Sequence, residues 1–144
     1  MFLGCVSLES IYIPARVRSI FSDEFIDCTS LREIIVDADN PYYYSEGNCI
    51  IDRQTGVLVK GCKTSVIPEG VTAIGESAFR FVRGIDTLVI PDTVTEIKAY
   101  AFADVVGIRE VHIPSSVKSI GTRAFDSVDS LYIEDLVSWL QVDV

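Results

Sequence analysis

The amino-acid sequence predicts a solenoid of short parallel strands joined by tight turns. Isoleucine–proline pairs recur every 23 residues, at Ile67-Pro68, Ile90-Pro91 and Ile113-Pro114. The segments between these pairs carry apolar side chains at matching positions, among them Phe79 and Phe102. A period in the twenties with constant apolar positions is typical of a solenoid, because each repeat buries its apolar side only against its neighbours.

The first repeats lie at residues 2–13 and 13–36. Residues 2–13 form the second half of a repeat, and residues 13–36 form a complete one that places Phe25 23 positions after Phe2. We therefore expect the chain to be a piece of a longer protein. An open apolar end would also favour association of two copies, so we expect a homo-oligomer to form through the repeat ends.

The repeat pattern breaks at Asp37, and residues 37–66 form a variant unit of different length. Residues 49–52 and 57–60 are apolar segments of strand length, and a four-residue loop ending in Gly56 joins them. Two such segments with a short glycine-containing loop indicate a β-hairpin. We predict that this hairpin replaces one side of a coil.

Regular repeats follow at residues 67–89, 90–112 and 113–133, the last of them three residues short. The pattern then changes in residues 134–144, where Leu136, Trp139 and Leu140 have helical spacing after Asp135, a residue suited to an N-cap. We expect a short amphipathic turn there to cover the end of the stack.

Each repeat is predicted to contain the same three parts. A strand of alternating residues, such as Leu88-Val89-Ile90, ends at a proline, which has no N–H for a strand ladder. A V-x-x-I segment then forms the opposite wall, and an Ala-Phe pair follows in a tight helical turn. We expect four phenylalanine rings to stack in one column: Phe25, Phe79, Phe102 and Phe125.

Composition argues against several classes of function. The formal net charge of −9 disfavours nucleic acid and anionic membrane surfaces as partners, and no apolar run approaches the ~18 residues of a membrane-spanning helix. The four cysteines form no C-x-x-C pair, which argues against zinc. Cys5 and Cys28 fall where other repeats have valine, so we expect packed thiols, although a disulfide between them is conceivable.

No residue set in the sequence requires a catalytic chemistry. The only histidine, His112, should point outward from a strand, and the segment 70–77 resembles a phosphate-binding loop with Glu76 in place of the required lysine. Calcium at Asp37, Asp39 and Asn40 is less favoured than ordinary turn chemistry before a proline. We therefore predict no catalytic residue, cofactor or metal.

The outward positions of the predicted strands offer a surface for a partner. Exposed aromatic and apolar residues in a row favour contact with another molecule, although Ile and Val are also ordinary strand residues. This first candidate surface consists of Tyr12, Ile35, Val89, His112 and Tyr132, with Glu33 and Glu110 beside them. A second candidate surface consists of Tyr42, Tyr43 and Tyr44.

The phrase L-x-x-I-x-I-P-x-x-V-x-x-I-x-x-x-A-F-x-x-C resembles the BspA-type leucine-rich repeat, over nearly the whole chain. The resemblance implies a right-handed leucine-rich-repeat coil and an extracellular or cell-surface location. It also implies a non-catalytic module for adhesion or recognition, with a protein or glycan on a host or neighbouring cell as partner. The alternative is a purely structural spacer in a larger surface protein.

Overall fold

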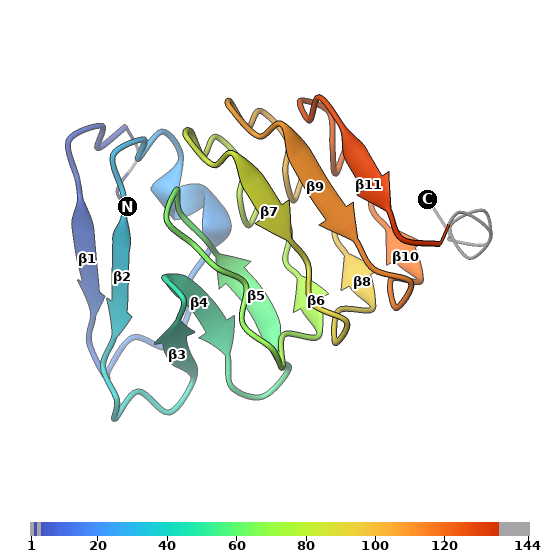
Figure 1. Ribbon diagram of the computed structural model, residues 1–144. Coiled ribbons are helices and arrows are strands. Elements are labelled where there is room, and N and C mark those ends of the chain that lie inside the picture. The colour runs from blue at the N-terminus through green and yellow to red at the C-terminus, as the bar shows by residue number, and fades with distance from the viewer. Residues whose placement is uncertain (1, 3, 136–144) are drawn as a thin grey trace.

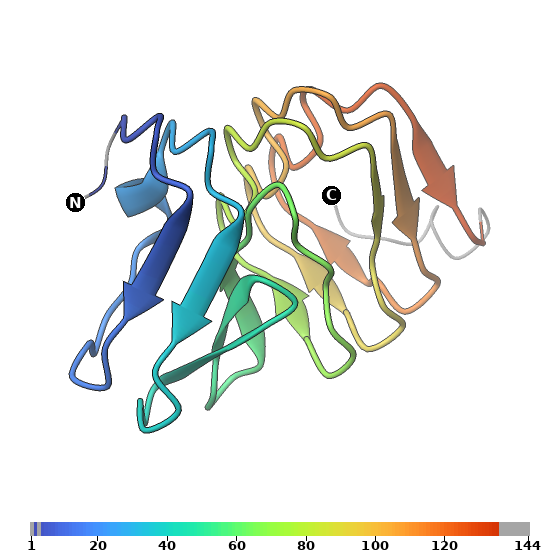
Figure 2. The same ribbon diagram turned by 60° about the vertical axis from the view of Figure 1, so that its left-hand side comes forward.

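The computed structural model describes residue 2 and residues 4–135, which form a solenoid with two walls (Figures 1 and 2). The front wall contains β1 (Ser10–Ile13), β2 (Glu33–Val36), β7 (Thr87–Val89), β9 (Glu110–Ile113) and β11 (Leu131–Ile133). The back wall contains β3 (Tyr43–Glu46), β4 (Cys49–Asp52), β5 (Val57–Lys60), β6 (Ala73–Ile74), β8 (Glu96–Ile97) and β10 (Ser119–Ile120). From β6 to β11 successive strands alternate between the back wall and the front wall, so the chain crosses between the walls twice in each regular coil, which confirms the predicted repeat solenoid.

The strands of successive coils pair in parallel at the sequence period. Tyr12 lies opposite Ile35 and Val89 opposite His112, which is a register of 23 residues in both cases. In the last repeat Tyr132 lies opposite His112, a register of 20, as its shortened sequence predicts. Because pairing is in register, equivalent side chains of neighbouring coils meet on the same face of the wall.

Phenylalanine rings stack through the core as predicted for three of the four repeats. The ring centroids of Phe79 and Phe102 lie 5.2 Å apart, and those of Phe102 and Phe125 lie 5.3 Å apart. Phe25 departs from the prediction, because it stacks on Phe2 at 5.7 Å and belongs to a different apolar cluster. The column is therefore interrupted between Phe25 and Phe79.

The interruption is made by the variant unit. The predicted strands at residues 49–52 and 57–60 are present with those bounds, but a third strand, β3, precedes them, and the three form an antiparallel meander up to β5. We call this meander, residues 43–60, the partition. Strand β4 is buried on both sides. Ile50 packs into the first apolar cluster, which contains Phe25, whereas Cys49 and Ile51 pack into the second apolar cluster, which contains Phe79.

The partition also closes the exposed edge of β2. The backbone N–H of Ile34 donates to Asn48 Oδ1 at 3.3 Å, and that of Val36 donates to Ser45 Oγ at 2.8 Å. Side chains thus satisfy donors that a neighbouring strand would otherwise bind. As a result β2 has no front-wall strand on that side, and β1–β2 forms a sheet separate from β7–β9–β11.

The Ala-Phe turns are mostly not helical. Only η1 (Ser22–Phe25) is a 3-10 helix in the described part of the chain, and the later repeats use turns instead. In those turns Ser77, Tyr100 and Arg123, again 23 residues apart, adopt φ of 55°, 56° and 54°. A residue in the left-handed region ends helical hydrogen bonding, which explains why the turn does not extend into a helix.

Two further predictions concern the ends and the cysteines. The amphipathic segment at Leu136, Trp139 and Leu140 lies outside the described residues. All four cysteines are free thiols; Cys49 and Cys62 are buried, whereas Cys5 and Cys28 are half-exposed rather than fully packed. None of the helices within residues 4–135 has the length and apolar character needed to cross a bilayer.

Candidate functional site

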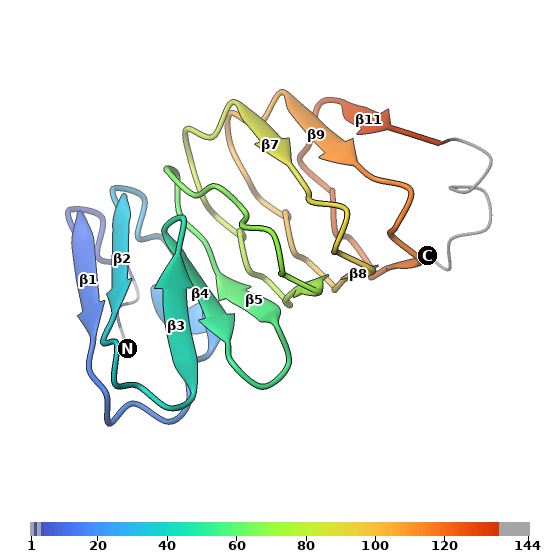
Figure 3. The same ribbon diagram turned by 60° about the horizontal axis from the view of Figure 1, so that its bottom comes forward.

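Strands β7, β9 and β11 lie side by side in the front wall (Figure 3), and they carry a row of outward side chains in register. Val89, His112 and Tyr132 occupy equivalent positions on these neighbouring strands. Outward residues alternate with core residues along each strand, so the three residues of β7 are exposed, buried and exposed in turn. Val89 is 61% exposed and Tyr132 is 56% exposed. We call Val89, His112 and Tyr132 the front row.

His112 is held in place from two directions. Its Nε2 lies 2.7 Å from Glu110 Oε1, and its ring centroid lies 4.9 Å from that of Tyr132 at an interplanar angle of 41°. A ring fixed by a carboxylate and a neighbouring aromatic loses little conformational freedom when a partner binds. The row therefore presents a pre-ordered surface, in which Glu110 is a supporting residue.

A hollow of about 170 Å³ lies beside the front row. It is lined by the exposed side chain of Val89, by the rings of His112 and Tyr132, by the carboxylates of Asp92 and Glu134, and by the adjoining residues Ile90, Ile113 and Pro114, which are buried. Glu134 is oriented by the backbone N–H of Ser115, which donates to its Oε2 at 3.1 Å. The hollow thus combines apolar surface, aromatic rings and negative charge.

The other outward residues of the first candidate surface lie on the separate β1–β2 sheet. Tyr12 is 57% exposed and faces outward beside Ile35, and Ser10 Oγ donates to Glu33 Oε2 at 2.7 Å. The hydroxyl of Tyr12 donates to Asp37 Oδ2, which raises the pKa of Tyr12 and lowers the pKa of Asp37. The row formed by Tyr12 and Ile35 is smaller than the front row, because the β1–β2 sheet has only two strands.

The predicted continuous row from Tyr12 to Tyr132 is therefore wrong in one respect. Tyr12, Ile35, Val89 and Tyr132 are exposed as predicted. The strands that carry the predicted row form two separate sheets, β1–β2 and β7–β9–β11, which lie apart in Figure 3. The partition lies between these sheets in sequence and prevents β2 from pairing with β7. Residues 37–66 were predicted to form a coil with a hairpin on one side. These residues contribute no strand to the front wall, so the parallel pairing of the front-wall strands is interrupted there.

The three consecutive tyrosines do not form a surface. Tyr43 is buried in the first cluster, where its hydroxyl accepts a hydrogen bond from the backbone N–H of Ile20 at 3.2 Å. Tyr44 is half-buried against the second cluster with the guanidinium of Arg53 5.3 Å from its ring centre. Only Tyr42 is exposed. The tyrosines are thus divided between the core and the surface by strand alternation.

Asn40 has a structural role rather than a metal-binding one. Its side chain is 1% exposed, and its Nδ2 donates to the carbonyls of Pro14 and Val17 at 3.0 and 3.1 Å. Its Oδ1 accepts from the N–H groups of Tyr42 and Tyr43 at 2.8 and 2.9 Å. Every polar atom of the amide is therefore in use. Over residues 4–135 no group of three or more His, Cys, Asp or Glu side chains is arranged to hold a metal.

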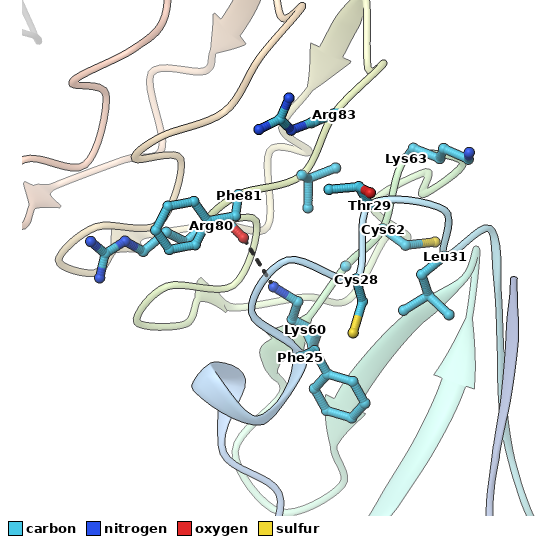
Figure 4. A pocket seen from close by; sticks show the side chains of 12 residues that line it. Phe25, Cys28, Thr29, Leu31, Lys60, Cys62, Lys63, Arg80, Phe81 and Arg83 are labelled. Atoms are coloured by element: carbon cyan, nitrogen blue, oxygen red, sulfur yellow. Dashed lines mark hydrogen bonds between the residues drawn. The ribbon is translucent and has the colours of Figure 1, made fainter. Parts of the chain in front are cut away.

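A buried lysine at the end of the partition was not anticipated from the sequence. Lys60 is 3% exposed, and its Nζ donates to the carbonyl of Arg80 at 3.3 Å beside a small cavity of about 10 Å³ (Figure 4). Burial lowers the pKa of Lys60 to about 8. The alternation of Val57-Leu58-Val59-Lys60 places Lys60 on the same side as Leu58, and this was the available signal.

Lys60 and Gly61 occupy the places that Ala78 and Phe79 hold in a regular coil. The backbone N–H of Gly61 donates to the carbonyl oxygen of Ala78 at 2.9 Å, just as the N–H of Phe79 donates to the carbonyl oxygen of Ala101 at 2.8 Å. A Cβ on Gly61 would lie 2.2 Å from Cε1 of Phe79, so only glycine admits the Phe79 ring here. The phenylalanine column ends at this glycine.

A wider hollow of about 740 Å³ runs between η1 and the back wall, and it was also missed. Phe21 is an exposed aromatic residue on its edge. Its charged groups carry both signs: Asp23 and Glu76 oppose Arg80, Lys98 and Arg123. The guanidinium of Arg80 is already paired with Asp104 at 3.0 Å. This hollow therefore has no net charge preference for a partner.

Comparison with protein families gives a match to the BspA type leucine rich repeat region, in 6 copies over residues 1–47 and 60–140. The unmatched interval, 48–59, contains β4 and most of β5, which are the irregular part of the partition. No curated protein is similar enough in sequence to count as a relative.

Solved structures of bacterial repeat proteins share the fold. A leucine-rich repeat protein from Eubacterium ventriosum is 22% identical with a TM-score of 0.76, over 88% of this chain and 36% of that one. The pneumococcal vaccine antigen PcpA is 20% identical with a TM-score of 0.68, over 78% of this chain and 29% of that one. A leucine rich cell surface protein from Faecalibacterium prausnitzii is 20% identical with a TM-score of 0.50, over 94% and 51%. This chain thus spans about a third to a half of their lengths.

Proposed function

Because this chain belongs to the BspA-type leucine-rich repeat family, we propose that it is a non-catalytic interaction module of a cell-surface or secreted protein. The module holds the front row toward a protein or glycan on a host or neighbouring cell. A surface location is supported by the cell surface protein of Faecalibacterium prausnitzii, which has the same fold.

The observation that carries the proposal is the in-register exposure of Val89, His112 and Tyr132 on three paired strands. Exposed apolar and aromatic side chains that are pre-ordered and adjacent are the usual anchors of a binding surface. His112 is braced by Glu110 and Tyr132, so little freedom remains to be lost on association.

The test replaces Val89, His112 and Tyr132 together by alanine and measures binding of the labelled chain to human epithelial cells by flow cytometry. Loss of three anchors should weaken binding at least about thirtyfold, the equivalent of one hot-spot residue at about 2 kcal/mol. The control replaces two exposed valines elsewhere, Val66 and Val106, by alanine and should bind as the parent does. Unchanged binding by the front-row variant, with unfolding at the parent temperature, would refute the proposal.

The second candidate function is a structural spacer in a longer surface protein. It is favoured by the continuous stacking of coils from Phe79 to Phe125, which gives a stiff unit whatever the surface does. Val89 and Ile35 are then ordinary strand residues. A spacer should bind no cell type above the background of an unrelated protein of similar charge.

A further inference from the structure

The front wall carries no positive side chain on its strands. The strand sequences are SIYI, EIIV, TLV, EVHI and LYI, although the chain contains 12 lysines and arginines. Arg109, which precedes β9, is paired with Asp86 at 3.2 Å. The carboxylates of Glu33 and Glu110 therefore share these strands with no lysine or arginine.

Negative charge is concentrated at the hollow beside the front row. Asp92 comes from the turn after β7, and Glu134 follows β11, so two coils of the solenoid bring these carboxylates to the same hollow. Asp92 forms no ion pair with any residue in the 4–135 range. No lysine or arginine lines the hollow. Lys118 lies outside the lining, where its Nζ donates to the carbonyl of Ser115 at 3.1 Å. The carboxylates of the hollow therefore attract an approaching cation.

We propose that this hollow docks a lysine or arginine side chain of a partner protein, an inference that rests on the interaction function proposed above. The methylene stem packs against the exposed side chain of Val89. The cationic head lies between the Asp92 and Glu134 carboxylates and against the exposed ring of Tyr132. Long cationic side chains bury their stems on apolar surface while the charge remains near water, which matches this division of the hollow.

Other occupants fit the hollow less well. A metal ion needs several oxygen ligands around one point, whereas the carboxylates in the lining are those of Asp92 and Glu134, which come from different coils. An anionic glycan or an acidic peptide would be repelled by the two carboxylates. A neutral glycan would stack on the ring of Tyr132 and donate hydroxyl hydrogen bonds to Asp92, but it would leave the negative charge of both carboxylates uncompensated. The combination of an exposed valine, an aromatic ring and two carboxylates favours a cationic side chain.

The experiment titrates the 15N-labelled chain with the peptides acetyl-Gly-Lys-Gly-amide and acetyl-Gly-Arg-Gly-amide and follows amide chemical shifts. Shift changes should centre on Val89, His112 and Tyr132, with a dissociation constant on the order of 1–10 mM for a single side chain. Peptides with norleucine, Nε-acetyl-lysine or glutamate at the middle position should produce no saturable change.

Matched variants separate charge from shape. Asp92→Asn with Glu134→Gln keeps the shape of the hollow and should weaken cationic peptide binding about tenfold, because two exposed ion pairs are lost. Tyr132→Leu removes the ring face and should bind more weakly, whereas Val66→Ala, at an exposed residue outside the hollow, should bind like the parent. Equal binding by the parent and the Asp92→Asn/Glu134→Gln variant would overturn the inference, as would tighter saturation of the same amides by calcium.

The two proposals fail separately. If the front-row alanine variant loses cell binding and the cationic peptides give no shifts, the interaction function stands and the lysine or arginine inference is wrong. If the peptides bind at the hollow while the alanine variant still binds cells normally, the cation site stands and the front row is not the cell-binding surface.

Discussion

The burial of Lys60 should make the stability of the chain depend on pH in a specific window. The pKa of Lys60 falls from 10.5 to about 8, chiefly because burial removes water from the ammonium group, while nearby Cys28 and Cys62 act weakly in the opposite direction. A difference of about 2.5 pKa units, at 1.36 kcal/mol each, corresponds to about 3 kcal/mol. This amount is lost from the free energy of unfolding at every pH at which Lys60 is charged in both the folded and the unfolded chain.

The sign follows from proton counting. Between about pH 8 and 10.5 the unfolded chain keeps a proton on Lys60 that the folded chain has lost, so the unfolded state binds more protons and stability rises with pH. Below pH 8 both states are protonated and the penalty is constant. The gain is therefore absent at pH 7, develops between pH 8 and 10.5, and is complete above that range.

Lys60→Met isolates this effect, because methionine has a similar length and no charge. At pH 7 the variant avoids about 3 kcal/mol of burial cost but leaves the carbonyl of Arg80 without its donor, a loss of about 1–2 kcal/mol. We expect a net gain of about 1–2 kcal/mol at pH 7. By pH 10.5 the variant should be the less stable of the two proteins, since only the hydrogen-bond loss remains.

The assay is urea unfolding followed by circular dichroism at intervals from pH 6.5 to 10.5, with reductant present for the four free cysteines. The quantity of interest is the free energy of unfolding of the variant minus that of the parent, because titratable groups that do not interact with Lys60 contribute equally to both. A difference that stays constant over this pH range would refute the claim that Lys60 is buried with a lowered pKa.

Three further changes test other parts of the structure. Phe102→Ala removes the central ring of the stack and should cost about 3–5 kcal/mol, with hydrogen exchange accelerating first in β8 and β9; uniform exchange would argue against a column. Asn40→Ala leaves the N–H groups of Tyr42 and Tyr43 unpaired and should lower the free energy of unfolding by about 2–4 kcal/mol, as urea unfolding would show. A decrease below ~1 kcal/mol would contradict the four hydrogen bonds of the Asn40 side chain. Burial raises the pKa of Cys49 to about 12, so this thiol should resist alkylation by iodoacetamide at pH 8 until urea is added. Mass spectrometry of the alkylated peptides would measure this, and rapid alkylation of the folded chain would contradict the burial of Cys49.

The periodic part of the fold could be predicted from the sequence because each coil contacts mainly the next one. Residues at a constant spacing, such as Phe79 and Phe102, then meet in space at a constant translation, and the parallel register repeats the sequence period. The bounds of β4 and β5 were also predictable, since short apolar segments around a glycine-containing loop are a local signal. The outward direction of Val89, His112 and Tyr132 follows from strand alternation alone.

Contacts outside the period were decided by the tertiary structure. The separation of Phe25 from Phe79, the burial of Tyr43 and Lys60, and the division of the front wall all arise where the partition meets the regular coils. The hollow with Asp92 and Glu134 likewise depends on how neighbouring turns leave their strands. A repeat pattern specifies what happens between equal units, because equal units pack by the same translation. Where the units are unequal, the packing of particular side chains across the boundary sets the arrangement.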